Sequence, residues 1–203
     1  MRWNTDKRYL GELAAAGVPV IDSHFLAPGD DPASMPDLAE FVVKPTVGAG
    51  SRGARRFVGT ERGQAIDHAG ALLDADRHVL VQPYLPAVDS AGETALLFFG
   101  GEYSHAIRKG PLLHRGEDAT RALFAAEHIT PRQPTDAEKS VAQAILAALP
   151  FEPPLYARVD LLPSPDGPKL LELELAEPSL FFDHAPGSAD RFAATLRAHL
   201  IAA

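Results

Sequence analysis

Residues 156–179 read YARVDLLPSPDGPKLLELELAEPS, and they decide the fold prediction for this chain. Two short apolar runs flank a turn rich in Pro, Asp and Gly, which is the pattern of a β-hairpin. Because alternate residues of a strand share a face, Arg158 and Asp160 point the same way, as do Glu172 and Glu174. A register that pairs Asp160 with Glu172 puts all four groups on one face, whereas a slip of one residue separates them.

Three carboxylates on one strand face repel one another, and burial disfavours their ionised form unless a cation lies nearby. A divalent ion with oxygen ligands meets that need, and Mg²⁺ bound together with a substrate phosphate fits this residue set. The sequence therefore predicts a magnesium site at Asp160, Glu172 and Glu174. The alternative is a solvated acidic strand face with no ligand, which this segment alone leaves open.

Composition narrows the class of protein. The 203 residues suffice for one domain of two lobes or for two small domains, and 46% of them are hydrophobic, as in ordinary globular proteins. The net charge of −8 argues against binding to nucleic acid. The chain has no cysteine, which excludes disulfides, thiolate metal sites and a cysteine nucleophile.

The start of the chain, MRWNTDKRYL, lacks the apolar core of a signal peptide. No apolar stretch approaches the roughly 20 residues of a membrane span. We therefore expect a cytoplasmic protein with no membrane partner. A zinc enzyme built on the eight histidines is disfavoured, because no two lie four residues apart and there is no His-Glu-x-x-His motif.

Hydrophobic periodicity and turn residues predict the order of the elements. Helices are expected at about residues 5–16, 60–75, 135–149 and 188–201. Besides the hairpin above, strands are expected at 18–21, 40–45, 55–58, 78–82, 93–99 and 102–108. Loops or connectors are expected at 22–37, 83–92 and 109–134. Because hairpins are frequent among these elements, the prediction is an α+β fold with mostly antiparallel sheets, not a doubly wound one.

Residues 47–57, VGAGSRGARRF, hold a glycine loop with the spacing Gly48-x-Gly50-x-x-Gly53. A dinucleotide fingerprint would need a helix inside the motif and an acid at a strand end about 20 residues on. The Lys-Ser/Thr pair of a P-loop and the first glycine of a nucleophile elbow at Ser51 are also missing. A strand–loop–strand flap over phosphates fits instead, and a flexible hairpin without a ligand remains the alternative.

Two lysines lie near this loop in the predicted order. Lys44 ends the apolar run FVVK and precedes Pro45, so it is either a surface strand end or a point charge aimed at a nucleotide phosphate. Protein kinases are excluded, because their lysine follows the glycine loop and because HRD and DFG motifs are missing here. Lys7 lies on the first predicted helix and by itself would be taken as solvated.

Seven segments, in order and across nearly the whole chain, resemble the ATP-grasp superfamily. They are the Asp6-Lys7 helix, VVKP with Lys44, the glycine loop, VQPYL, Gly92-Glu93, the IRK strand end with Arg108 and Lys109, and RVDLL with LLELE. No single motif is specific, but their order is. The resemblance is to carboxylate–amine ligases such as D-alanine–D-alanine ligase and bacterial glutathione synthetase. FFGGEYSHAIRK and LELELAEPSLFF add a likeness to the cycloserine-pathway ligase.

The resemblance implies one ATP-grasp domain over residues 1–203, with two α+β lobes that clasp ATP between them. The small lobe would cover about 18–83, and the large lobe about 1–17 and 84–203. Ligases of this kind carry another N-terminal domain before the Asp-Lys helix, whereas this chain starts five residues before Asp6. A nucleotide-binding module without independent ligase activity therefore stays open as an alternative.

The resemblance also implies a role for each site residue. The ATP phosphates would meet Lys7, Lys44, Gly48, Gly50, Ser51 and Gly53. The base would meet Gln82 and the backbone of Tyr84 and Leu85, and the ribose would meet Glu93 or Asp89. Mg²⁺, with Mn²⁺ as the alternative, would bind Asp160, Glu172 and Glu174. The transferring phosphoryl group or the tetrahedral intermediate would be stabilised by Arg158, Arg108 and Lys44.

The implied reaction is ATP-dependent amide-bond formation. A carboxylate attacks the γ-phosphate of ATP, and an amine then displaces phosphate from the acyl phosphate. The chain needs cations and positioning for this chemistry, and no covalent nucleophile. The substrates would be small, amino-acid-like carboxylates and amines, and His114 and Arg115 are candidates on the substrate side. A homodimer is an open alternative to a monomer.

Overall fold

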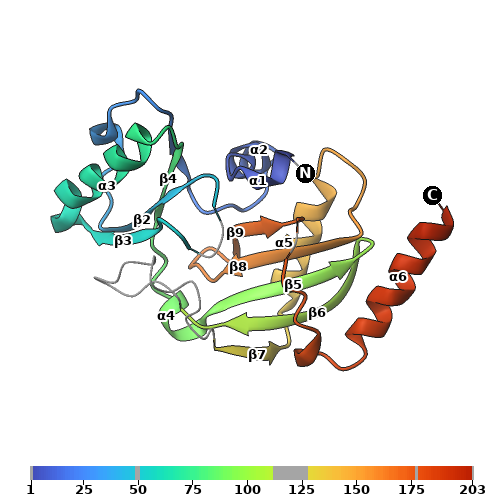
Figure 1. The fold of residues 1–203 in the computed structure, drawn as a ribbon. Coiled ribbons are helices and arrows are strands. Elements are labelled where there is room, and N and C mark those ends of the chain that lie inside the picture. The colour runs from blue at the N-terminus through green and yellow to red at the C-terminus, as the bar shows by residue number, and fades with distance from the viewer. Residues whose placement is uncertain (1, 49–50, 112–127, 177, 203) are drawn as a thin grey trace.

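The structure is a computed structural model that describes residues 2–48, 51–111, 128–176 and 178–202. Two separate β-sheets dominate it, one of four strands and one of five (Figure 1). Every strand pair in both sheets is antiparallel. This arrangement confirms the predicted α+β class, and the sheets are joined by the connector that follows β4 (Figure 1).

The four-stranded sheet has the order β1–β4–β2–β3. Its strands are β1 (His24–Leu26), β2 (Glu40–Pro45), β3 (Arg55–Val58) and β4 (Val79–Pro83). Helix α3 (Arg62–Asp74) lies against one face of this sheet (Figure 1). Its apolar stripe of Ala65, Ala69 and Leu72 is buried against strand residues such as Phe41 and Val81. Short 3₁₀ turns occupy Pro32–Ser34 and Gly59–Glu61.

The five-stranded sheet has the order β7–β6–β5–β8–β9. Its strands are β5 (Glu93–Phe99), β6 (Glu102–Lys109), β7 (Ile129–Arg132), β8 (Tyr156–Leu162) and β9 (Lys169–Glu174). The connector before β5 contains the short helix α4 (Val88–Ala91). The predicted bounds of the two lobes stay a prediction, although the two sheets do fall on either side of residues 84–92.

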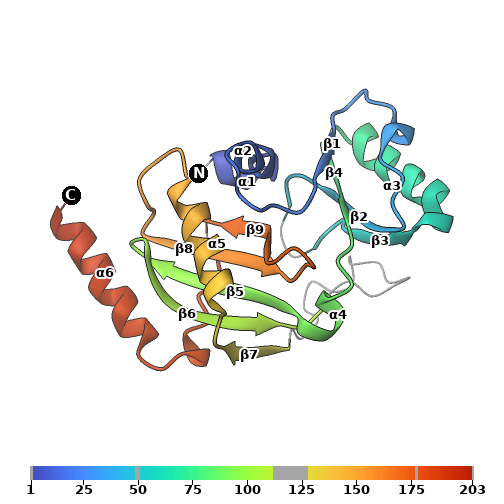
Figure 2. The same cartoon turned by 180° about the vertical axis from the view of Figure 1, so that it is seen from behind.

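Helices cover one face of the five-stranded sheet, and Leu180 and Phe181 from the segment before α6 pack against Ala95, Leu97 and Ile107 of its strands. On one face, α2 (Tyr9–Ala15) and α5 (Asp136–Ala147) share a buried core with the strands, in which Leu10 and Ile145 meet Val159 and Leu173 (Figure 2). The short helix α1 (Arg2–Thr5) precedes α2. Helix α6 (Ser188–Ala202) lies beside the ends of β5 and β6 (Figure 1), where Phe192 packs against Phe99, the last residue of β5, with ring centroids 5.2 Å apart. No helix in the described ranges is long and apolar enough to cross a bilayer.

Local signals predicted several elements well. Strands 40–45, 55–58 and 93–99 have the expected bounds. The helix expected from residue 135 opens with a capping box, in which the Glu138 amide donates to Thr135 Oγ1 at 3.2 Å and the Thr135 amide donates to Glu138 Oε2 at 2.7 Å. The helix that it opens ends at Ala147, two residues earlier than expected.

Other predictions were wrong at short or polar segments. β1 lies in the predicted loop 22–37, and β7 lies in the predicted loop 109–134; each has only three or four residues and depends on a distant partner strand. Residues 18–21 form an isolated parallel bridge, Val20 to Leu170, and not a strand. The first predicted helix is broken, because the Lys7 amide donates to Thr46 O at 2.9 Å, a contact outside any helix.

Candidate functional site

A cavity of about 550 Å³ is lined by residues of both sheets. Lys44 and Gln82 line it from the four-stranded sheet, and Glu93 and Arg158 line it from the five-stranded sheet. Twelve of the predicted site residues line this cavity: Lys7, Lys44, Gly48, Ser51, Gln82, Tyr84, Leu85, Glu93, Arg158, Asp160, Glu172 and Glu174. The tertiary structure thus brings together side chains that are spread from position 7 to position 174.

The hairpin of β8 and β9 has the register that places its charged residues on one face. Arg158 pairs with Glu174, and Asp160 pairs with Glu172, which confirms the register considered from the sequence. A bulge at Leu171 precedes these pairs, since Leu161 pairs with Leu170 and Asp160 already pairs with Glu172. All four charged side chains line the cavity.

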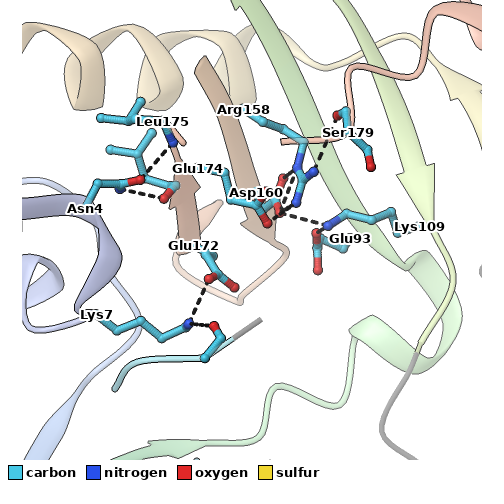
Figure 3. A network of polar contacts seen from close by, with 12 residues as sticks. Asn4, Lys7, Glu93, Lys109, Arg158, Asp160, Glu172, Glu174, Leu175 and Ser179 are labelled. Atoms are coloured by element: carbon cyan, nitrogen blue, oxygen red, sulfur yellow. Dashed lines mark hydrogen bonds and ion pairs between the residues drawn. The ribbon is translucent and has the colours of Figure 1, made fainter. Parts of the chain in front are cut away.

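A chain of alternating charges crosses the floor of the cavity (Figure 3). Arg158 donates from Nε to Asp160 Oδ1 at 2.9 Å and from Nη2 to Asp160 Oδ2 at 3.0 Å, and it also contacts Glu174. Lys109 Nζ lies 2.8 Å from Asp160 Oδ2 and forms an ion pair with Glu93. Because Asp160 is 2% exposed, these cations compensate a carboxylate that is out of reach of bulk water.

The environment separates the pKa values of these carboxyl groups. Burial raises the pKa of Asp160, but the guanidinium of Arg158 and the ammonium of Lys109 outweigh burial and hold that pKa well below its usual range. Burial raises the pKa of Glu93 to about 7, although Lys109 opposes the shift. Burial likewise raises the pKa of Glu174 to about 7 against the opposing charge of Arg158. Asp160 is therefore the permanent anion, and its two neighbours are poised to take up a proton near neutral pH.

Lys7 connects the glycine loop with β9. Its Nζ donates to the backbone oxygen of Gly48 at 3.0 Å and lies 2.9 Å from Glu172 Oε1 (Figure 3). Only 7% of Lys7 is exposed, so it is not the solvated lysine that its position on a helix would suggest. The contact places a cation where the two sheets approach each other.

Lys44 also lines the cavity, but its ammonium has a different environment. Burial lowers its pKa to about 8, the carboxylate of Glu172 opposes that shift, and the charge of Lys7 adds to it. Within the described part of the chain, Lys44 Nζ makes no hydrogen bond or ion pair. A half-buried cation without such a partner favours an anionic ligand in the cavity.

The three carboxylates predicted to hold a metal are each close to a protein cation. Among the described residues, no group of three or more His, Asp or Glu side chains is arranged to hold a metal ion. Glu172 and Glu174 nevertheless line the cavity with side chains 30% and 29% exposed. Their hard oxygen donors fit Mg²⁺, which is usually bound through one or two carboxylates together with substrate phosphates. The full three-carboxylate site stays a prediction.

Gln82, Tyr84 and Leu85 also line the cavity, and Tyr84 and Leu85 pack against the small apolar cluster of Ile21, Val88 and Leu162. The Tyr84 amide donates to Glu40 O at 2.8 Å, so this backbone donor is already in use. The Leu85 amide donates to no residue that the structure describes. Of the two residues whose backbone was predicted to meet the base, Leu85 is thus the one whose amide can donate to a ligand.

Three predicted site residues are not among those that line the cavity. Asp89 accepts a hydrogen bond from the Tyr84 hydroxyl and lies 3.3 Å from Arg56 Nη2. Gly53 packs beside Pro45, where an added Cβ would come within 3.3 Å of the proline ring. Arg108 donates from Nε to Ala91 O at 2.6 Å and from Nη2 to Ser90 O at 3.0 Å. The predicted roles of Gly50, His114 and Arg115 fall outside the described residues.

Sequence reasoning assigned no role to Lys109, although this lysine takes the place in the cavity that was predicted for Arg108. A β-bulge between Leu97 and Phe98 shifts the register of the β5–β6 hairpin, so that Glu93 pairs with Lys109. Without the bulge, the register near the turn would pair Glu93 with Arg108. Neither the composition of β6 nor the alternation of its residues indicates this extra residue, so Lys109 could not be identified from the sequence.

Comparison with known proteins identifies relatives of this chain. No family model matches the chain. It is 42% identical over 214 residues to the cycloserine biosynthesis protein DcsG of Streptomyces lavendulae, covering 98% of this chain and 71% of that protein. The crystal structure of D-cycloserine synthetase DcsG matches with a TM-score of 0.87 and 39% identity, over 98% of this chain and 71% of that one.

Two more distant structures share the fold. D-alanine–D-alanine ligase from Bacillus anthracis complexed with ATP matches with a TM-score of 0.65 and 18% identity, over 95% of this chain and 63% of that one. The ATP-grasp ligase PsnB complexed with a phosphomimetic variant of minimal precursor, Mg and ADP matches with a TM-score of 0.66 and 19% identity, over 97% and 58%. At these identities the likeness shows the fold alone.

Proposed function

Because the chain belongs to the ATP-grasp ligases, we propose that it is an ATP- and Mg²⁺-dependent ligase that joins a small carboxylate to an amine. The fold is the ATP-grasp fold. The observation that carries the proposal is the cavity itself, in which Lys7, Lys44 and Arg158 come together with acidic oxygens from β9. Such a set suits a reaction whose main requirement is to neutralise and position phosphate oxygens.

Each cation has a distinct task in this proposal. Lys44, which has no described partner, binds a nucleotide phosphate as a point charge. Lys7 holds the backbone of Gly48, and it can exchange its contact with Glu172 for one with a phosphate oxygen. Arg158 offers its fixed guanidinium to the negative charge that develops as the phosphoryl group is transferred, because Asp160 holds it in position.

The acidic residues of β9 supply the metal-binding part of the proposal. Glu172 and Glu174 would hold Mg²⁺, or Mn²⁺, with Asp160 behind them. When bound, the ion neutralises phosphate charge and aligns the nucleotide tail. Glu174 then exchanges part of its contact with Arg158 for the ion, which leaves the guanidinium more available to the reacting group.

The substrates are proposed to be small and amino-acid-like. DcsG is a cycloserine biosynthesis protein, and its structure is that of a D-cycloserine synthetase. The carboxylate would attack the γ-phosphate, and the amine would displace phosphate from the acyl phosphate. The chain contains no cysteine, so this route does not pass through a cysteinyl intermediate.

Phosphate release tests the proposal directly. The purified chain is incubated with Mg·ATP and a panel of D- and L-amino acids and related amines, and phosphate is measured in the steady state. A ligase releases phosphate only with the right acceptor pair, so release should depend on specific members of the panel. Phosphate release that is the same with and without every acceptor would contradict ligase activity.

A second candidate is an ATP-binding module that needs another polypeptide for acceptor binding. The chain spans 71% of DcsG and 63% of the D-alanine–D-alanine ligase. This module would show a higher melting temperature with Mg·ATP but no turnover with any acceptor. Thermal unfolding and phosphate release, measured on the same sample, therefore separate the two candidates.

A further inference from the structure

Gln82 is held from behind by a side chain that the sequence did not single out. Its Nε2 donates to Ser23 Oγ at 2.9 Å, and Gln82 is 2% exposed while it lines the cavity. Ser23 directly precedes β1, in which His24 pairs with Val81 and Phe25 pairs with Leu80 of β4. Continuing this register by one residue puts Ser23 opposite Gln82, so the contact follows from strand pairing.

The direction of the Gln82 amide can be deduced from the partners of Ser23. Ser23 Oγ lies 2.7 Å from the backbone oxygen of Ile21, and a carbonyl oxygen can only accept. The single hydroxyl hydrogen of Ser23 is therefore used on Ile21. The Gln82 atom that faces Ser23 must then be a donor, which is the amide nitrogen. This reasoning resolves the usual ambiguity between the nitrogen and the oxygen of a glutamine side chain.

The opposite atom of the same amide is consequently an acceptor. No residue in the described part of the chain donates to Gln82 Oε1. Leu85 lines the same cavity, and its backbone amide likewise has no described acceptor. Next to the apolar side chains of Ile21 and Leu162, the cavity thus offers one acceptor and one donor at its base end.

We propose that Ser23 is a positioning residue that fixes Gln82 as an acceptor and thereby selects an adenine over a 6-oxopurine. The inference rests on the proposed use of ATP. An adenine presents a 6-amino donor beside the N1 acceptor, whereas hypoxanthine and guanine present a 6-oxo acceptor beside an N1–H donor. Gln82 Oε1 and the Leu85 amide complement the first pattern, and both would be mismatched with the second.

The hydroxyl of Ser23 also ties this selection to the other sheet. The Ile21 amide donates to Leu170 O at 3.1 Å, and the Leu170 amide donates to Pro19 O at 2.8 Å. Leu170 belongs to β9, which carries Glu172 two residues later. The backbone that accepts the hydrogen bond of Ser23 is therefore paired with the strand that carries Glu172 of the proposed metal site.

Binding of nucleotides that differ only at the purine ring tests this inference. Mg·ATP, Mg·purine riboside triphosphate, which lacks the 6-amino group, and Mg·inosine triphosphate are titrated calorimetrically into the full chain. The wild-type protein should bind ATP about tenfold more tightly than purine riboside triphosphate, which corresponds to one hydrogen bond, and inosine triphosphate more weakly still. These ratios report the contact to Gln82, and overall stability does not change them.

Variants of Ser23 identify the positioning role. In Ser23→Ala the amide loses its partner and can turn, so the preference for ATP over both analogues should fall to within about twofold. Ser23→Thr keeps the hydroxyl and should keep the wild-type ratios. Ser34→Ala removes a matched hydroxyl that donates to Asp31 O at 2.7 Å away from the cavity, and it should also keep them.

The outcomes separate the two proposals. If the wild-type chain binds ATP but binds purine riboside triphosphate equally well, or if folded Ser23→Ala keeps the full preference, the inference about Ser23 is overturned. If Ser23→Ala does not fold, the wild-type ratio still decides. If the wild-type chain binds none of the three nucleotides, the proposed function itself fails, and the inference falls with it.

Discussion

The two hairpins of the five-stranded sheet each contain one β-bulge. The polar face of β8–β9 could be anticipated from the sequence, whereas that of β5–β6 could not. In β8–β9, a bulge at Leu171 brings Glu172 and Glu174 opposite Asp160 and Arg158. In β5–β6, a bulge beside Phe98 brings Lys109, and not Arg108, opposite Glu93. On β9 the charged residues alternate with leucine, so only one face can be polar. On β6 two cations are adjacent, so either can face the cavity and the bulge alone decides.

This comparison shows what a one-residue irregularity does to a site. Each bulge changes which side chains lie on the cavity face, although neither changes the residue types available. The result is a continuous network in which Glu93 and Lys109 from one hairpin meet Asp160 and Arg158 from the other. Four experiments test whether the two bulges have these consequences.

The largest expected effect separates the two adjacent cations of β6. Lys109→Met leaves two buried carboxyl groups short of a counter-charge and should lower the free energy of unfolding by about 3–5 kcal/mol. Arg108→Met removes two hydrogen bonds to backbone carbonyls near α4 and should cost about 1–2 kcal/mol. Urea denaturation measures both. Equal losses for the two variants would show that the bulge does not decide which cation matters.

The next effect concerns catalysis and the β8–β9 hairpin. Arg158→Ala should lower acceptor-dependent phosphate release by about 10²–10³-fold, because a charge that faces the transferring group is lost. Circular dichroism checks that the variant is folded, and Arg132→Ala, which removes a partner of Glu138 at 3.1 Å, is the matched control outside the cavity. A nearly wild-type rate in folded Arg158→Ala would refute the role of this arginine.

A smaller effect is expected from pH, since each hairpin carries one carboxyl group whose pKa is raised to about 7. A raised pKa in the folded state means that Glu93 and Glu174 contribute stability at acid pH that is lost as the pH rises through about 7. The free energy of unfolding should therefore fall by a few kcal/mol, about 2 kcal/mol for each group, between pH 5 and pH 8. Denaturation curves of Glu93→Gln and Glu174→Gln should each show a weaker fall; unchanged curves would contradict the assignment.

The smallest expected effect is on ATP binding, and it distinguishes Glu93, the first residue of β5, from Asp89 in the connector before it. Glu93 lines the cavity, whereas Asp89 is held by Tyr84 and Arg56 outside it. If Glu93 is the acid that binds ribose, Glu93→Gln should weaken ATP binding several-fold, by about one charge-assisted hydrogen bond, and Asp89→Asn should change it less than about twofold. Calorimetric titration measures both, and the reverse order would assign the ribose contact to Asp89.

Much of the scaffold could be predicted because its signals are local. The strands 40–45 and 93–99 are apolar runs with clear ends, and Thr135 with Glu138 makes a capping box within one helical turn. β1 and β7 escaped prediction because three or four residues carry little periodicity and pair with strands far away in the chain. Their existence is decided by the neighbouring strand and not by their own composition.

The candidate site shows the same division. Alternation with a period of two could place Arg158 beside Asp160 and Glu172 beside Glu174, but the register that joins the two pairs on one face depended on the bulge at Leu171. Other features could not be predicted. These are which cation pairs with each carboxylate, the position of Arg108 outside the cavity, and the hydrogen bond from Gln82 to Ser23.

The chemical groups, most of the longer helices and strands and the alternation of the acidic hairpin could be inferred from the amino-acid sequence. The tertiary structure decided the partners: Lys7 for Glu172, Lys109 for Asp160 and Ser23 for Gln82. The physical reason is the separation along the chain of the residues that interact. Alternation and capping depend on neighbours along the chain, whereas bulges and buried ion pairs depend on strands and lobes that meet only after folding.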